Sequence, residues 1–477
     1  MPGGGMGRRG LWLCGCLALG ACTLGPNYRL PALAIVNDPS ARGSFVSKGP
    51  ALSEAPLPPN WWRLYQDPRL DDLIQAALAA NTDLRVADAN LERSHALLQE
   101  AKSEQQPRIA VDAGVEDSQI AGEQYGRPIT PPVNGYYAGG ATIGYDLDLF
   151  GGIRRGIEAA KADDQAVEAA RDLVRVNVAG ETARAYADAC GDGLQLAAAK
   201  RSLALQQESL AMTLRLIRGG RAIALDATRA HQLVDQQMTT IPVLEAGQRN
   251  ALFRLATLTG RPPALFDQDL QACSQPPRLA QALPVGDGQM LLKRRPDVRQ
   301  AERQLAAATA EIGVQTAALF PDISIGVSGG SNGSIATALT SPTNYWAIGP
   351  LLSWQANQSA TRARIMGAKA GARMALAHFD GVVLGALRDT DMALNLYLHD
   401  LQREQSAIAA RDDAAKAVSD SQRLQHDGRA TALGVLDAER TLASSEQSLA
   451  QLRSSISTDQ IAVFLSLGGG WETKPPT

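Results

Sequence analysis

After its first 21 residues the chain has no run of about 18 consecutive apolar residues, which excludes a transmembrane helix. A chain that crosses a membrane without such helices must do so as a closed barrel. Charged residues make up 20% of the chain and the net charge is −3, so nothing suggests a nucleic-acid-binding surface. The five histidines are scattered, and no catalytic, phosphate-binding or metal-binding motif is present. The sequence therefore predicts no enzyme, no cofactor and no metal site.

The N-terminus carries Arg8 and Arg9, then an apolar run, then Leu19-Gly20-Ala21-Cys22. This order is typical of a secretory signal peptide over residues 1–21. The last four residues resemble the lipobox of bacterial lipoproteins, which implies cleavage before Cys22 and acylation of its thiol. The alternative is an ordinary cleavage site. Thr23 follows the cysteine, and by the same resemblance this implies sorting to the outer membrane.

Once a signal peptide is removed, few cysteines are left, and they form no disulfide framework. Cys190 lies in a helical pattern, and Cys273 lies in a proline-rich link. The sequence leaves open whether these two thiols are free or paired.

The chain contains an internal repeat. Residues 83–109 align without a gap on residues 297–323, and seven of the 27 positions are identical. Each copy has apolar residues at steps of three and four, then a proline (Pro107 or Pro321), then alternating apolar and polar residues. The repeated unit is therefore a helix followed by a strand.

Four segments alternate in the manner of strands with one apolar face. They are residues 109–115, 137–149, 323–327 and 346–354. Since single-chain membrane barrels have at least about eight strands, closure would need several copies of the chain.

Proline is absent from residues 133–241 and 351–474. Because an interior proline costs a helix about 3 kcal/mol, these stretches leave room for very long helices, and residues 359–426 would reach about 100 Å. Residues 215–225 match residues 423–433 at seven of eleven positions, including Gly220 and Gly428. A glycine at this position lets the chain reverse from one helix into the next, so the pattern predicts a helical hairpin in each half of the chain. A shorter first helix is expected over residues 61–78.

Several short motifs, in this order, resemble the lipoprotein branch of the TolC-like outer membrane factors. They are Cys22 with Gly25-Pro26-Asn27-Tyr28, Trp61-Trp62, Asp146-Leu147-Asp148-Leu149-Phe150-Gly151, Arg295-Pro296-Asp297, Phe320-Pro321, Leu436-Asp437-Ala438 and Leu467-Gly468-Gly469-Gly470-Trp471. One departure is residues 357–361, Asn-Gln-Ser-Ala-Thr, where the family usually has a Phe-Asp-Gly-Gly-Arg-like turn. That departure leaves the geometry of the second strand-to-helix turn open.

The resemblance implies an α+β membrane protein. It would be a homotrimer in which four strands per chain build a twelve-stranded outer-membrane β-barrel, continued into the periplasm by a long α-helical coiled-coil barrel. Such proteins are passive, gated exit channels of tripartite efflux pumps. The implied partners are a periplasmic adaptor (membrane fusion) protein, an inner-membrane transporter of the RND type, and the lipid of the outer membrane.

These features divide the chain into six parts. They are the signal peptide 1–21, a lipid-anchored extended arm 22–60, a first efflux repeat 61–270, a linker 271–290, a second efflux repeat 291–471, and a tail 472–477.

The resemblance also implies roles for individual residues. Leu433 and Asp437 would form rings about the threefold axis and close the periplasmic end, since a leucine ring blocks water and a carboxylate ring attracts cations. The alternative is that Leu433 packs the hairpin and Asp437 is merely solvated. The tip residues Gly220, Arg221, Gly428 and Arg429 would reverse the helices and also dock the adaptor.

Two other functions remain as alternatives. One is an outer-membrane channel for type I protein secretion. The other is a non-conducting coiled-coil envelope lipoprotein, which would need no strands. The identity of the cargo does not follow from the sequence.

Overall fold

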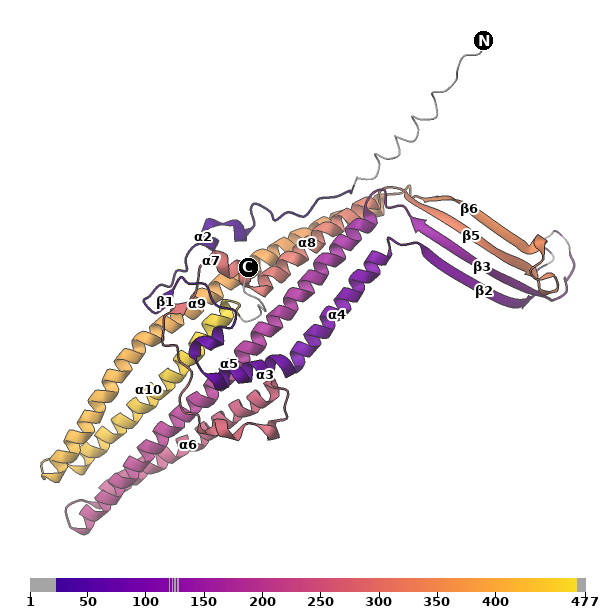
Figure 1. Ribbon diagram of the computed structural model, residues 1–477. Coiled ribbons are helices and arrows are strands. Elements are labelled where there is room, and N and C mark those ends of the chain that lie inside the picture. Colours follow the sequence, from indigo (N-terminus) through magenta and orange to yellow (C-terminus); the bar gives the residue numbers. More distant parts are fainter. Residues whose placement is uncertain (1–22, 120, 122, 124–125, 127, 470–477) are drawn as a thin grey trace. The chain divides into compact units, whose positions relative to one another are not determined.

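The computed structural model describes residues 23–119, 121, 123, 126 and 128–469. These residues belong to two compact units. The sheet unit contains residues up to 31, 91–167 and 301–379, and the hairpin unit contains residues 32–90, 168–300 and 380 onward. In chain order the helices and strands are α2 Pro39–Arg42, β1 Leu52–Ser53, α3 Pro68–Ala80, α4 Thr82–Ser103, β2 Arg108–Ser118, β3 Asn134–Asp146, α5 Gly152–Arg218, α6 Ala224–Leu258, β4 Leu283–Pro284, α7 Gly288–Arg294, α8 Pro296–Ala317, β5 Asp322–Ser334, β6 Asn344–Ser353, α9 Ser359–His426 and α10 Ala432–Ser466 (Figure 1).

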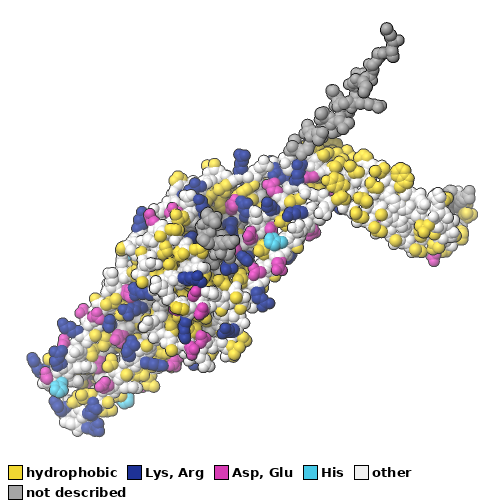
Figure 2. Space-filling model, viewed as in Figure 1, with side chains coloured by type: hydrophobic (Ala, Val, Ile, Leu, Met, Phe, Trp, Pro, Cys, Tyr) yellow, Lys and Arg dark blue, Asp and Glu magenta, His cyan; other side chains and the backbone are white. Residues whose placement is uncertain are grey.

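The sheet unit holds one antiparallel sheet with the strand order β2-β3-β5-β6 (Figure 1). Ile143 pairs with Ile109 on one side and Val327 on the other, and Val327 pairs with Ile348. Because directly paired residues point to the same face, this register gathers the apolar positions of all four strands on one face. That face is solvent-exposed in the single chain, with Ile109 69% and Ile348 66% exposed. Figure 2 shows hydrophobic side chains over the strands and charged side chains concentrated over the helices.

The second strand ends three residues earlier than the sequence predicted. The amide of Leu147 still donates to the carbonyl of Ile323 at 2.8 Å. Asp148 then turns the chain, because its carboxylate accepts from the backbone amides of Ile153 at 3.1 Å and Arg154 at 2.9 Å. A carboxylate in this place caps the first turn of α5 and stops the strand.

The turn between β6 and α9, which the sequence left open, uses an amide side chain in the corresponding place. The Asn357 Oδ1 accepts from the backbone amide of Ser359 at 3.3 Å and from its hydroxyl at 2.9 Å. The side chains of Gln358 and Trp354 both donate to the carbonyl of Leu319, at 2.9 Å and 3.1 Å. The start of α9 is thus fastened to the end of α8 without the glycine-rich turn.

Two helical hairpins carry the predicted reversals (Figure 1): α5 returns through α6, and α9 returns through α10. Gly220 and Gly428 have φ angles of 69° and 72°, the left-handed region that glycine tolerates best. In both loops the next amide donates to a carbonyl five residues earlier at 2.8 Å, which closes the end of the first helix. The helix predicted over residues 359–426 is confirmed as α9. No helix within the described residues is both long enough and apolar enough to cross a bilayer.

The prediction of one helix over residues 61–78 was wrong. Trp61–Tyr65 is a separate 3-10 turn, followed by Gln66 in the left-handed conformation with φ 55°. Asp67 is extended because a residue before proline disfavours the helical conformation, and its carboxylate accepts from two backbone amides of α3 at 3.0 Å and 3.3 Å. Pro68 then occupies the first helical position, where its missing N–H costs nothing.

The core of the hairpin unit is centred on Trp61, which is fully buried. Its ring stacks on Phe464 of α10, with ring centroids 4.5 Å apart, and meets Trp62 edge-on at 5.9 Å. In the same core a disulfide joins Cys190 of α5 to Cys273 in the segment that follows α6, with 4.7 Å between the two Cα atoms. This bond answers the question of pairing that the sequence left open.

Candidate functional site at the hairpin tips

The first tip is the loop between α5 and α6, and it exposes both Gly220 and Arg221. Two residues further on, Ile223 is 62% exposed. Its backbone amide donates to the carboxylate of Asp226 at 3.3 Å, which fixes the first turn of α6. The loop therefore presents a cation and an apolar side chain on a defined backbone.

The second tip repeats this arrangement between α9 and α10, where Gly428 and Arg429 are exposed. The hydroxyl of Thr431 accepts from the backbone amide of Gly434 at 3.3 Å and caps α10. Each predicted tip arginine thus directly follows a left-handed glycine.

The predicted gate residues lie one helical turn apart near the start of α10. Leu433 is 40% exposed, and the side chain of Asp437 is 57% exposed. Of the three residues between them, Val435 and Leu436 are buried at 3% and 4% and face the rest of the unit. Asp437 also forms an ion pair with Arg440 at 3.2 Å. Both predicted gate residues therefore lie on the outward side of α10, where a second copy of the chain could meet them.

A buried acid that the sequence did not single out lies close to the predicted gate residues. Glu439 is only 5% exposed, and its Oε1 accepts from the side-chain amide of Gln422 on α9 at 3.1 Å. Burial raises the pKa of the Glu439 carboxyl, against the lowering effect of hydrogen bonds from Ser209 and Gln422. The sequence spacing could have revealed this burial. Glu439 lies four residues after Val435 and three residues before Leu442, both of which are buried, so it falls on the buried face of α10.

Two further buried acids come from the same two helices. Asp400 of α9 is 4% exposed and Asp459 of α10 is 9% exposed. Arg403 donates to the Asp400 carboxylate at 2.6 Å. Burial, followed by the nearby Asp400 carboxylate, raises the pKa of Asp459 to about 7, although Arg184 and Arg403 act in the opposite direction. Two carboxyl groups this close share a proton more readily than they both ionise.

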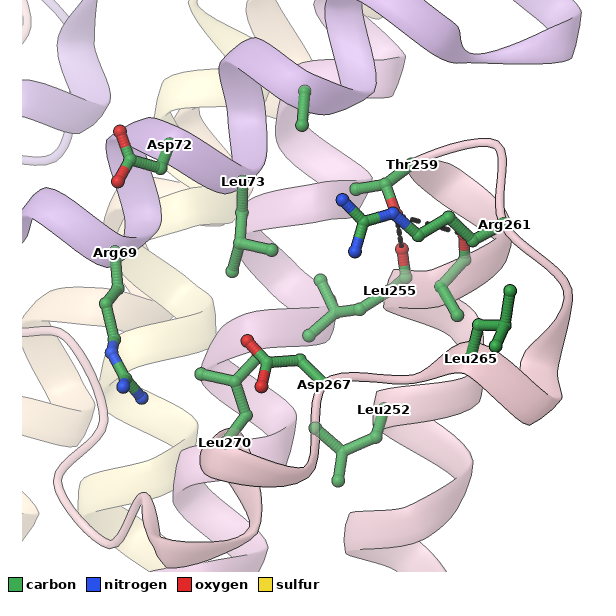
Figure 3. Close-up of a pocket in the computed structure, with 12 residues that line it drawn as sticks. Arg69, Asp72, Leu73, Leu252, Leu255, Thr259, Arg261, Leu265, Asp267 and Leu270 are labelled. Carbon is green, nitrogen blue, oxygen red and sulfur yellow. Dashed lines mark hydrogen bonds between the residues drawn. The ribbon is translucent and has the colours of Figure 1, made fainter.

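A pocket of about 350 Å³ lies between α3, the end of α6 and the segment that follows. Figure 3 shows the Arg261 guanidinium directed between Leu73 and Leu255. The hydroxyl of Thr259 donates to the carbonyl of Leu255 at 2.9 Å, and Asp267 accepts a local backbone amide at 2.9 Å. The side chains of Thr259 and Asp267 are therefore hydrogen-bonded to backbone groups of nearby turns. The charged side chains of the hairpin tips, in contrast, face solvent.

Some predictions concern residues outside the described ranges. They are the signal peptide 1–21, the lipidated Cys22, the end of the last motif at Trp471, and the tail 472–477.

The fold defines the class of protein. Residues 73–261 and 288–469 match the family described as outer membrane efflux protein. The structure resembles the outer-membrane channel OprN with a TM-score of 0.87 and 33% identity, covering 94% of this chain and all of that one. It also resembles the open state of the Neisseria gonorrhoeae MtrE outer membrane channel, with a TM-score of 0.81, 25% identity, and coverage of 96% and 100%.

Two curated relatives are similar along nearly their whole length. The toluene efflux pump outer membrane protein TtgI of Pseudomonas putida is 30% identical over 468 residues, covering 95% of this chain and 97% of that protein. Nodulation protein T of Rhizobium leguminosarum bv. trifolii is 27% identical over 464 residues, covering 95% and 96%.

The chain belongs to the outer membrane efflux protein family. It is an outer-membrane component of an efflux system, and its family consists of transport components rather than enzymes.

Proposed function

We propose that three copies of the chain form a passive, gated exit channel of a tripartite pump, which releases small toxic molecules to the exterior. A periplasmic adaptor and an inner-membrane transporter of the RND type would load it. In this proposal each chain contributes four strands to a twelve-stranded barrel in the outer membrane. The helical hairpins continue the barrel into the periplasm, and acyl chains on Cys22 add an anchor.

One observation carries the proposal: a four-stranded sheet with one exposed apolar face and two open edges. The sheet order leaves β2 and β6 each with an unpaired edge within the chain. A lipid environment accepts an apolar face but no unpaired backbone edge, so the edges must pair with something else. Pairing of β6 with β2 of the next copy supplies that partner and closes the ring.

The spacing of aromatic residues supports the same arrangement. Trp346 lies in β6 and Trp354 is the residue directly after its end; they share a parity, are 80% and 54% exposed, and lie eight residues apart, which is about 26 Å of extended chain. Tyr137 and Tyr145 repeat this separation on β3. Outer-membrane barrels have an apolar band of about 25 Å with aromatic residues at both borders.

The gate is tested by the double variant Leu433→Ala, Asp437→Ala. Widening the closed end and removing its carboxylates is expected to raise ion conductance across a planar bilayer several-fold and to admit large antibiotics into intact cells. The measurements are single-channel conductance and antibiotic susceptibility.

The internal repeat supplies a matched control. Leu225 and Arg229 occupy the aligned positions in the first hairpin, and Leu225 is 50% exposed. Leu225→Ala with Arg229→Ala is expected to leave conductance unchanged. Equal conductance of wild type and the Leu433, Asp437 variant would place the gate elsewhere, and a chain that never conducts would favour the non-conducting lipoprotein.

The docking role of the tips has a separate test. A photo-crosslinking residue placed at Arg221 or Arg429 in intact cells is expected to capture one periplasmic adaptor, identified by mass spectrometry. The control position is Lys200, which pairs with Glu245 at 3.0 Å along the α5–α6 hairpin. If the adaptor is captured from Lys200 alone, or from neither tip, Arg221 and Arg429 do not dock it and contribute only to the reversal of the helices.

The proposed division of the chain rests on the lipid anchor and the two repeats. It consists of the signal peptide 1–21, the anchored arm 22–60, efflux repeats 61–270 and 291–471 joined by the linker 271–290, and the tail 472–477. The matched ranges 73–261 and 288–469 support two repeats. Type I protein secretion remains an alternative function.

A further inference from the structure

The first described residues of the chain are fastened to one buried side chain. The guanidinium of Arg155, in the first turns of α5, is only 3% exposed. Its Nε donates to the carbonyl of Leu24 at 3.0 Å, and its Nη2 donates to the carbonyl of Gly25 at 3.2 Å and to the Asn27 side chain at 2.7 Å. The Nη1 donates to Glu158 at 2.6 Å, which holds the guanidinium in place.

The backbone is built to pass closely over this arginine. Gly25 has a φ of +87°, and a Cβ added to it would lie 2.5 Å from the Cα of Gly313 on α8. A Cβ on Gly313 would in turn lie 2.7 Å from the side chain of Arg155. The two glycines therefore allow the arm, the arginine and α8 to interlock.

The same segment is also fixed to the corner between β3 and α5. The amide of Leu24 donates to the carbonyl of Phe150 at 3.2 Å. A Cβ on Gly151 would lie 2.5 Å from the methyl carbon of Thr23. Phe150 stacks on Phe320, which precedes β5, with ring centroids 4.6 Å apart. This corner is the base of the sheet whose apolar face is exposed.

Further along the arm, Tyr28 adds a second attachment. Its hydroxyl donates to Glu302 at 2.8 Å, and the guanidinium carbon of Arg303 lies 5.5 Å from its ring centroid. The segment from Thr23 to Tyr28 is thus held on both sides, although it has no regular secondary structure.

We infer that Arg155 is a positioning residue that clamps the N-terminal arm at the base of the sheet, so that lipid on Cys22 enters the outer membrane beside the apolar face. This inference rests on the proposed acylation of Cys22. An anchor on a loose arm would add only membrane affinity. An anchor held at this corner also fixes the depth of the sheet in the bilayer.

The test is tryptic cleavage after the exposed Arg29 in the full-length protein in outer-membrane vesicles. The variants Arg155→Ala and Asn27→Ala remove opposite partners of the clamp. Each is expected to speed cleavage at Arg29 at least about tenfold, because loss of charge-assisted hydrogen bonds raises the population of the released arm. Arg155→Lys keeps the charge but loses the fork of donors, and is expected to lie between them and wild type.

The matched control is Arg154→Ala. Arg154 lies in the same turn of α5 as Arg155 and pairs with Asp148, which precedes the helix, at 3.1 Å. The Arg154 guanidinium donates to the carboxylate and to the backbone carbonyl of Asp148. This variant should leave cleavage at the wild-type rate. Asn27→Ala leaves α5 untouched, so it reports on the clamp even if Arg155→Ala impairs folding. Wild-type cleavage rates for both Arg155→Ala and Asn27→Ala would overturn the clamp.

Acylation is read separately, by palmitate labelling of the same variants. Equal labelling with faster cleavage supports the whole inference. A chain exported with a non-lipoprotein signal and Cys22→Ser should keep the slow cleavage of wild type, because the clamp needs no lipid. Unlabelled wild type with the same differences in cleavage would overturn the anchor and retain the clamp.

Discussion

Replacing both Cys190 and Cys273 with alanine is expected to lower the free energy of unfolding by about 4.5 kcal/mol, since the bond closes a loop with a sequence separation of 83. Alanine avoids placing a hydroxyl in the core, where Cys190 is fully buried. The bond also holds the linking segment directly on α5: a Cβ on Gly193 would lie 1.9 Å from the carbonyl oxygen of Cys273.

The measurement is thermal unfolding of the purified protein in detergent, with and without reductant. Reductant should lower the melting temperature of wild type and leave that of the alanine variant unchanged. An oxidising compartment outside the cytoplasm would preserve the bond. A wild-type melting temperature that does not respond to reduction would contradict this role.

Asp459→Asn is expected to stabilise the protein at pH 8 and to have little effect at pH 4. The carboxyl of the unfolded chain ionises near the ordinary aspartate pKa of 3.8, whereas the folded carboxyl keeps its proton up to a pKa of about 7. Between these values only the folded state binds the proton, so stability falls as pH rises and then levels off above pH 7. A pKa difference of about 3 units corresponds to at most about 4 kcal/mol.

The asparagine keeps a donor for Asp400 and cannot ionise. Melting temperatures measured from pH 4 to pH 8 should therefore diverge between wild type and variant as pH rises. The control is Asp412→Asn on α9, the helix that carries Asp400, because the Asp412 side chain is 59% exposed and pairs with Arg411. Parallel pH curves for wild type and Asp459→Asn would show that the acid pair does not share a proton.

Local chemistry explains why much of the fold could be predicted. The great length of α9 followed from the absence of proline, and the reversals followed from Gly220 and Gly428, since each depends on the backbone alone. The parity of each strand was also readable. The common apolar face required the register between strands, which no single segment contains.

The features that sequence reasoning missed depend on contacts between distant segments. Nothing near Arg155 in the sequence indicates that residues 24–27 provide its acceptors. Asp459 becomes unusual only because α9 brings Asp400 beside it. The end of β3 was misplaced because Leu147 and Leu149 continue the strand pattern, while Asp148 between them had already begun to cap α5. For the site itself, the sequence located the tip loops, and the roles of Leu433 and Asp437 remain predictions.

The open edges of the sheet also have a genetic consequence. In the proposed ring, every copy supplies one edge to each of two seams, so a single defective β6 leaves the whole ring unclosed. A damaged allele would therefore do more than fail to contribute, because its product would disable the intact copies that assemble with it. Such an allele would be dominant. Selection on the edge strands would therefore depend on whether the whole ring closes, and not on whether the single chain folds.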